Sequence, residues 1–240
     1  MMPDLDTLYA VCEATWPPER AWQAHSATLR DGQGGGKRVC AATSDTIPDA
    51  AGLAQLEQDM RAMDQTPLFM IRAQDAGLDQ ALADSGYQVI DPVHVYRAPI
   101  AALTNVPMPP VTCFTIWQPL AMMVEIWAQG GIGPGRIAVM ERAAVKTGIL
   151  ARWNEKPAGA AFAGLHGNTC MVHAVEVLGH QRRQGVAQWM MRKAAFWAQE
   201  NGAEWMSVLC TKANQPANQL YQAMGFEAIG AYHYRIKGTT

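Results

Sequence analysis

The chain has 240 residues, of which 49% are hydrophobic and 17% charged, and its formal net charge is -2 at pH 7. This composition can fill a hydrophobic core and argues against intrinsic disorder. The nearly neutral charge gives no electrostatic support for nucleic-acid binding. No apolar run is long enough to span a bilayer, and Asp4 and Asp6 stand where a signal peptide would be basic. We therefore expect a cytoplasmic protein with neither nucleic-acid nor membrane partners.

Five cysteines are spread along the chain, and no Cys-x-x-Cys pair occurs. This usage is typical of reduced thiols in a cytosolic protein and not of a disulfide framework or zinc site. His166, Cys170 and His173 have a loosely metal-like spacing, but they fall on one predicted hairpin with no fourth ligand. We predict no metal.

The first half of the sequence predicts short helices and strands. The expected helices cover residues 5–14, 20–29, 48–63 and 75–85, and the expected strands cover 39–42, 67–71 and 87–97. Residues 99–110 contain four prolines and no periodicity, so we predict a linker there. The predicted domains are therefore 1–98 and 111–240.

The second half predicts two helices, three strands and then alternating helices and strands. The expected helices are 119–129, 134–144, 188–199 and 216–224, and the expected strands are 147–153, 158–165, 168–178, 204–210 and 226–236. Since helices alternate with strands only after the third strand, we expect a mixed α/β sheet. It should be antiparallel at first, with a parallel pair flanking the long helix.

Residues 81–90 resemble residues 219–229: each segment has a helix, a glycine cap, an aromatic residue and a strand. Gly86 matches Gly225, and Tyr87 matches Phe226. Repeats of this size indicate two copies of one fold. The first copy is smaller and carries no basic turn, because residues 46–52 contain no arginine. We interpret it as a degenerate half-domain.

A basic turn near residue 180 carries the strongest chemical signal. It lies between a predicted strand, 171–178, and a predicted helix, 188–199. The free backbone N–H groups and the positive end of the helix dipole should converge there on an anion. Arg182 and Arg183 add positive charge, and Gly185 permits close approach of a ligand to the backbone. The sequence thus predicts a pyrophosphate-binding turn.

Two motifs carry a resemblance to a known family. Arg182-Arg-Gln-Gly-Val-Ala187 fits R/Q-x-x-G-x-G/A, and the downstream segment from Asn214 to Phe226 fits N-x3-N-x2-Y-x3-G-F. Together, in this order and each at a strand–helix junction, they resemble the Gcn5-related N-acetyltransferases, the GNAT family. The resemblance covers residues 111–240. It implies a mixed, partly antiparallel, twisted sheet flanked by helices, and acetyl-CoA as co-substrate.

The resemblance also implies roles for particular residues. Strands 171–178 and 204–210 should splay apart around the acetyl-thioester, and Tyr221 should protonate the departing thiolate. Val175 and Val177 should offer strand backbone to the pantetheine amides, and Asn214 and Asn218 should bind near the pantetheine. The pyrophosphate should be held by the backbone of Arg182, Arg183, Gln184, Gly185, Val186 and Ala187.

The general base is open between Glu176 and a chain of water molecules. Glu176 lies on the strand before the basic turn, close to the expected thioester. His173 is three residues earlier, so strand alternation directs the two side chains to opposite faces unless a bulge intervenes. We favour Glu176 over the other side chains, and a water chain is an equally good candidate. A structural or edge-strand carboxylate with no chemical role is the more common interpretation of such a residue.

The sequence therefore predicts an acetyl-CoA-dependent N-acetyltransferase that acts on an amine of a small molecule or protein, as a monomer or homodimer. The degenerate first copy motivates an alternative, a non-catalytic acyl-CoA-binding or interaction module. A hydroxyl acceptor or a longer acyl chain is a further alternative. The acceptor leaves no recognisable signature in the chain.

Overall fold

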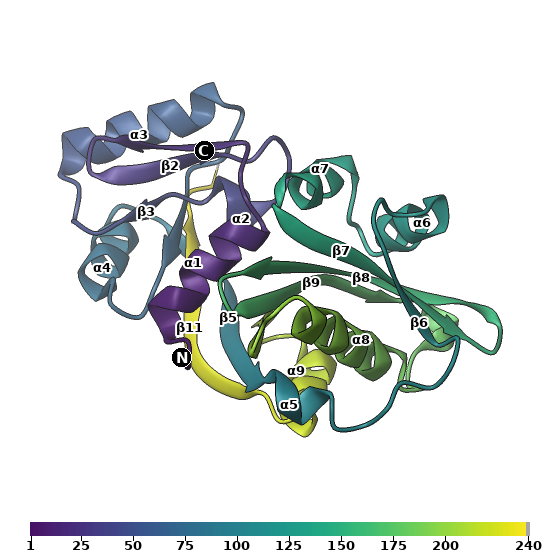
Figure 1. Cartoon of the computed structure of the whole chain (residues 1–240). Helices are drawn as coiled ribbons and strands as arrows, with labels where there is room; N and C mark the ends of the chain where they lie inside the picture. The colour runs from purple at the N-terminus through teal and green to yellow at the C-terminus, as the bar shows by residue number, and fades with distance from the viewer. Residues whose placement is uncertain (239–240) are drawn as a thin grey trace.

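An eight-stranded sheet runs through the whole chain in the computed structural model, which describes residues 1–238 (Figure 1). Its strand order is β4-β11-β5-β10-β9-β8-β7-β6. A separate antiparallel sheet contains β1, β2 and β3. The strands span Arg20–Ala24 (β1), Ala27–Asp31 (β2), Thr43–Ser44 (β3), Leu68–Ile71 (β4), Gln88–Pro99 (β5), Cys113–Ile116 (β6), Val145–Trp153 (β7), Lys156–His166 (β8), Thr169–Val177 (β9), Trp205–Thr211 (β10) and Glu227–Ile236 (β11).

Helices cover both faces of the large sheet. They span Leu5–Thr15 (α1), Lys37–Cys40 (α2), Ala50–Ala62 (α3), Ala76–Asp84 (α4), Ile100–Leu103 (α5), Ala121–Gln129 (α6), Pro134–Arg142 (α7), Val186–Glu200 (α8) and Gln215–Ala223 (α9), and Gly179–Gln181 forms a short 3-10 turn. None of these helices, within residues 1–238, is long and apolar enough to cross a membrane.

The predicted mixed sheet is confirmed. β6, β7, β8 and β9 are antiparallel neighbours, and β9 and β10 form the parallel pair. The helix between that pair, α8, packs a Met- and Ala-rich stripe on one face of the sheet. Helices α6 and α7 pack Trp127 and Met140 on the other face, against Phe162 (Figure 1).

The two sequence repeats exchange strands about a local two-fold arrangement. β5 of the first half lies between β10 and β11 of the second half, and β11 lies between β5 and β4. In this exchange Gln88 pairs with Ile236, and Arg97 pairs with Glu227. Residues 88 and 227 are 139 positions apart, and so are residues 97 and 236. The repeat that relates Gly86 to Gly225 by 139 positions therefore converts the first of these pairs into the second. The repeat found in the sequence is therefore a structural repeat.

Four expectations about local structure were wrong. Residues 20–29 form a hairpin, β1–β2, since His25 adopts a left-handed conformation at the turn and apolar residues alternate on both strands. Residues 37–40 form the short helix α2 in place of a strand, and β6 was missed. The predicted linker also contains a helix, α5, whose Ile100 and Leu103 are buried against α8.

Candidate active site

The parallel neighbours β9 and β10 part at their carboxyl ends. They pair from Thr169 opposite Trp205 to Val172 opposite Val208, and no further. Beyond this point β9 pairs only with β8, and β10 pairs only with β5. A gap between adjacent strands thus opens where the family resemblance places the thioester. Both predicted motifs follow directly, at the starts of α8 and α9.

A β-bulge in β9 lies at this gap. Ala174 has a φ of 52°, and the pairing shifts from Phe162 opposite His173 to Ala160 opposite Glu176. The Trp127 indole donates a hydrogen bond of 2.9 Å to the Ala174 carbonyl. Because Phe162 and Ala160 share a face of β8, His173 and Glu176 also share a face. The expectation of opposite faces was therefore wrong for the reason foreseen, a bulge.

The predicted pyrophosphate turn presents free backbone donors. Gly185 precedes α8 with φ 78° and ψ 1°, and no side chain caps the helix. In the described chain no acceptor meets the five consecutive backbone N–H groups from Arg183 to Ala187. These donors and the helix dipole suit a phosphate, so the turn fits the pyrophosphate of coenzyme A. The Arg182 side chain instead folds back, and its Nε donates to the Val177 carbonyl at 3.1 Å.

The two asparagines of the second motif are engaged within the protein. Asn214 caps α9 by accepting a hydrogen bond from the Ala217 N–H at 3.3 Å. Asn218 is buried, and its amide donates to the carbonyls of Thr211 at 3.0 Å and Asn214 at 2.8 Å. Its Oδ1 accepts from the Tyr96 hydroxyl at 2.9 Å. Asn218 thus holds the end of β10 against α9 and β5.

Tyr221 is buried on α9, with its ring 5.9 Å from that of Tyr96 and 5.7 Å from that of Phe226. Its hydroxyl makes no hydrogen bond to any of residues 1–238. Burial raises the pKa of Tyr221 well above its ordinary value, so the hydroxyl keeps its proton. It is a donor without a protein partner, as a general acid requires.

His173 has both ring nitrogens engaged. The Thr15 hydroxyl donates to the Val11 carbonyl at 2.7 Å, so it accepts from His173 Nε2–H at 2.8 Å. His173 Nδ1 is then the acceptor for Arg38 Nη1 at 2.9 Å. Burial and the Arg38 charge hold the pKa of His173 well below its ordinary value. A neutral imidazole with an occupied lone pair is a poor base.

Glu176 is half-buried against the end of α6, where a Cβ added to Gly130 would lie 2.3 Å from its carboxyl carbon. Burial raises the pKa of Glu176, and Arg182 and Arg136 partly oppose the rise. Since His173 is engaged, Glu176 is the titratable group that the bulge leaves available on this face. It lines neither of the two cavities described next.

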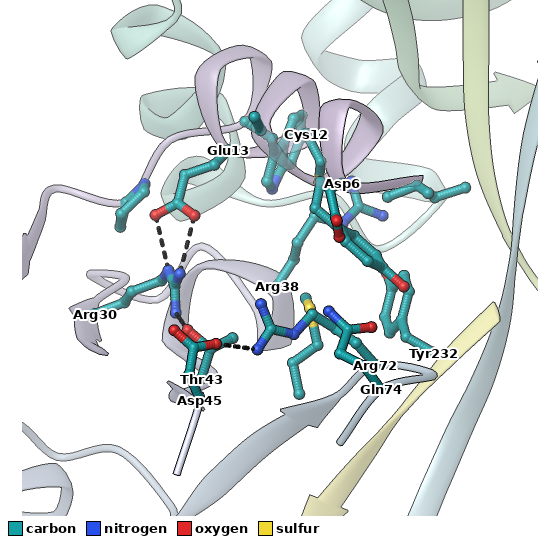
Figure 2. Close-up of a pocket in the computed structure, with 16 residues that line it drawn as sticks. Asp6, Cys12, Glu13, Arg30, Arg38, Thr43, Asp45, Arg72, Gln74 and Tyr232 are labelled. Atoms are coloured by element: carbon teal, nitrogen blue, oxygen red, sulfur yellow. Dashed lines mark hydrogen bonds and ion pairs between the residues drawn. The ribbon is translucent and has the colours of Figure 1, made fainter. Parts of the chain in front are cut away.

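Two neighbouring cavities lie between the halves of the chain, and neither was predicted from the sequence. The smaller, about 240 Å³, is lined by His173, Ala174 and Thr211 from the strand gap and by Gly35 to Arg38 from the first half. The larger, about 430 Å³, reaches α1, β2 and β4 (Figure 2). Both contain Trp16, Arg38 and Tyr232.

No cluster of three or more potential metal-ligating side chains occurs within the part of the chain that the structure describes.

Comparison with known proteins identifies the family of this site. The sequence model of the Acetyltransferase (GNAT) family matches residues 116–226. This segment contains the strand gap, the basic turn and the second motif. The chain therefore carries a GNAT-family acetyltransferase domain.

Relatives extend the likeness beyond the GNAT domain. The chain is 28% identical to an uncharacterised N-acetyltransferase, YobR of Bacillus subtilis, over 98% of this chain and all of that protein. A GCN5-related N-acetyltransferase from Kribbella flavida has a TM-score of 0.75 at 16% identity, covering 100% of this chain and 98% of that one. A tandem GNAT protein from the clavulanic acid biosynthesis pathway has a TM-score of 0.60 at 14% identity, covering 98% and 89%. The two-part architecture of this chain thus recurs in solved structures.

Proposed function

We propose that the protein transfers the acetyl group of acetyl-CoA directly to the amine of a small molecule. The observation that carries the proposal is the coincidence of three features at the ends of β9 and β10: the strand gap, the free amides from Arg183 to Ala187, and the unpaired Tyr221 hydroxyl. The smaller cavity between the halves opens on this gap at Ala174 and Thr211, which favours a small acceptor over a protein chain.

Each step of the proposed reaction is assigned to particular residues of the chain. The turn at Gly185 binds the pyrophosphate, and the edge of β9 offers the backbone of Val175 and the N–H of Val177 to the pantetheine, since the Val177 carbonyl accepts from Arg182. Glu176 takes a proton from the acceptor ammonium, so that the amine nitrogen can attack the thioester carbonyl. The C–S bond breaks as the amide forms, and the Tyr221 hydroxyl protonates the leaving thiolate. The second proton lost by the nitrogen then restores the Tyr221 hydroxyl.

The pyrophosphate turn is tested with a pair of glycine variants on α8. Gly185 and Gly202 lie at opposite ends of this helix, with φ of 78° and 85°, and neither has a backbone atom close to an added Cβ. A β-branched side chain in this conformation strains each site by about 1–2 kcal/mol. Gly185→Val should also obstruct the free amides, so we expect at least a tenfold loss of CoA affinity by calorimetry. Gly202→Val should be destabilised equally and bind CoA normally.

Equal CoA affinity in both variants would show that the turn is not the site. Thiol release from acetyl-CoA across an amine panel separates transfer from simple binding. An enzyme releases thiol in an amine-dependent way, whereas CoA binding with no turnover on any amine would favour the non-catalytic module.

A further inference from the structure

Three arginines line the larger cavity, and two of them have the Nε–Nη2 edge of the guanidinium filled by carboxylates (Figure 2). Arg30 donates from Nε and Nη2 to the two oxygens of Glu13, at 2.9 Å each. Arg72 donates from Nε to Asp75 at 2.9 Å and from Nη2 to Asp45 at 2.7 Å. The two N–H groups on this edge can bind the two oxygens of one carboxylate in parallel.

The third arginine, Arg38, has no carboxylate on this edge, and the Tyr232 hydroxyl lies beside its guanidinium. Its hydrogen bond is from Nη1 to His173, and no ion pair joins it to any carboxylate of residues 1–238. Its Nε is buried and has no hydrogen-bond partner in the described chain. An enclosed guanidinium donor without an acceptor is costly, and the cost disappears when an anion supplies the acceptor.

The surroundings of Arg38 fit a bound ligand. Tyr9 lines the same cavity, and its hydroxyl is likewise buried without a partner among residues 1–238. The Tyr232 hydroxyl, beside Arg38, accepts from Tyr234 at 3.5 Å and keeps its own proton to donate. Three acids line this cavity: Glu13 and Asp45 are paired with Arg30 and Arg72, and Asp6 forms no ion pair with Arg38.

Arg38 is also joined to the strand gap. Its Nη1 bonds to His173, the residue before the bulge, and Arg38 lines the smaller cavity together with Ala174 and Thr211. Thr15 of α1 fixes the imidazole from its other side. His173 is thus a positioning residue that aims the guanidinium. Because Arg38 lines both cavities, a group that it holds in the larger cavity lies next to the smaller one, which opens on the gap.

We propose that Arg38 binds a carboxylate of the acceptor, so that the substrate is an amino acid or another amine that carries a carboxylate. This inference rests on the proposed function, and it assigns acceptor recognition to the first half of the chain. The carboxylate would occupy the Nε–Nη2 edge, and the Tyr9 and Tyr232 hydroxyls would be further donors to it.

The test compares acids with matched amides in the full-length protein. Binding of N-acetyl-L-amino acids, the expected products, and of their C-terminal amides is measured by calorimetry with CoA present and absent. Thiol release is measured with the corresponding free amino acids and amino-acid amides. We expect at least one acid to bind, and its amide to bind about tenfold to a hundredfold more weakly.

Variants then test whether Arg38 is the source of the preference for acid over amide. Arg38→Gln should remove the preference for acid over amide and raise KM for the acid by a similar factor, and Arg38→Lys should restore only part of it, since an ammonium lacks the fork. Arg20→Gln, which alters an exposed arginine outside both cavities, should change neither value. Thermal unfolding reports whether each variant is folded.

Equal binding of acids and amides, no binding of either set, or an unchanged preference in Arg38→Gln would overturn the inference. The comparison of acid with amide in the unmodified protein decides it even if Arg38→Gln does not fold. Absence of CoA binding would instead overturn the proposed function, and the product-binding measurement without CoA would still report on Arg38.

Discussion

Asn218 and Tyr221 lie about one helical turn apart on α9, yet the structure gives them different tasks. Each polar atom of the Asn218 side chain is engaged with the protein, whereas the Tyr221 hydroxyl has no partner within residues 1–238. The motif thus combines a residue that shapes the end of β10 with a residue free to act on a ligand. Mutation of either would reduce activity, but only that of Tyr221 would do so without a loss of structure.

Tyr221→Phe should lower kcat by about a hundredfold, as loss of a general acid does, and leave the Kd for CoA within about threefold. Steady-state kinetics and calorimetry measure the two values. Because burial raises the pKa of Tyr221, the unmodified enzyme should show no loss of activity from this group below pH 10. Tyr87→Phe, which removes a distant hydroxyl bonded to Glu57 at 3.1 Å, is the control and should keep full turnover. An unchanged kcat in Tyr221→Phe would exclude the assigned role.

If Glu176 is the general base, its protonation determines where activity falls on the acid side of the pH profile. The base acts when deprotonated, and burial raises its pKa above 4.5, so activity should fall on acidification at a higher pH than for an exposed glutamate. Arg136 lowers this pKa, so Arg136→Gln should move the limb of kcat/KM to higher pH. Arg152→Gln, near the end of β7, should not move it. Full activity in Glu176→Gln would favour the water chain as the base.

At the scale of elements, the bulge in β9 decides which side chains face the acceptor. One extra residue reverses the alternation, so His173 and Glu176 meet on one side of the strand. Nothing in the local sequence marks this bulge, since Ala174 is not a residue typical of a positive φ. Its anchor is Trp127, far away in sequence on α6. The basic turn, by contrast, was predictable because its glycine and arginines are adjacent in the chain.

Trp127→Phe should release this anchor. The partly buried Ala174 carbonyl would lose its donor, which costs about 1–3 kcal/mol in the free energy of unfolding. Chemical denaturation measures this loss, and kcat should fall because Glu176 is no longer held in position. Trp205→Phe, at the start of β10, is the control and should retain activity. Equal kcat in Trp127→Phe and the unmodified enzyme would show that the bulge persists without this bond.

At the scale of the whole molecule, the two halves are neither independent domains nor a simple tandem. Tyr96 of the first half, and Ile100 and Leu103 of the predicted linker, belong to the same buried cluster as Met190 and Tyr221 of the second half. The sequence could reveal the repeat but not the exchange of strands. Because β5 and β11 follow equivalent helices and glycines, pairing within a copy and pairing between copies use the same local pattern, and only the assembled sheet distinguishes them.

The exchange predicts how the protein responds to division at the predicted linker. A fragment of residues 111–240 lacks β5, so β10 and β11 lose their common neighbour and the buried cluster loses three large side chains. We expect this fragment to be unfolded or aggregated by circular dichroism and size-exclusion chromatography. Co-expression with residues 1–110 should restore a folded complex that binds CoA, since the missing strand is then supplied in trans. A monomeric, folded fragment 111–240 with normal CoA affinity would instead support two autonomous domains, with the first half serving acceptor recognition alone.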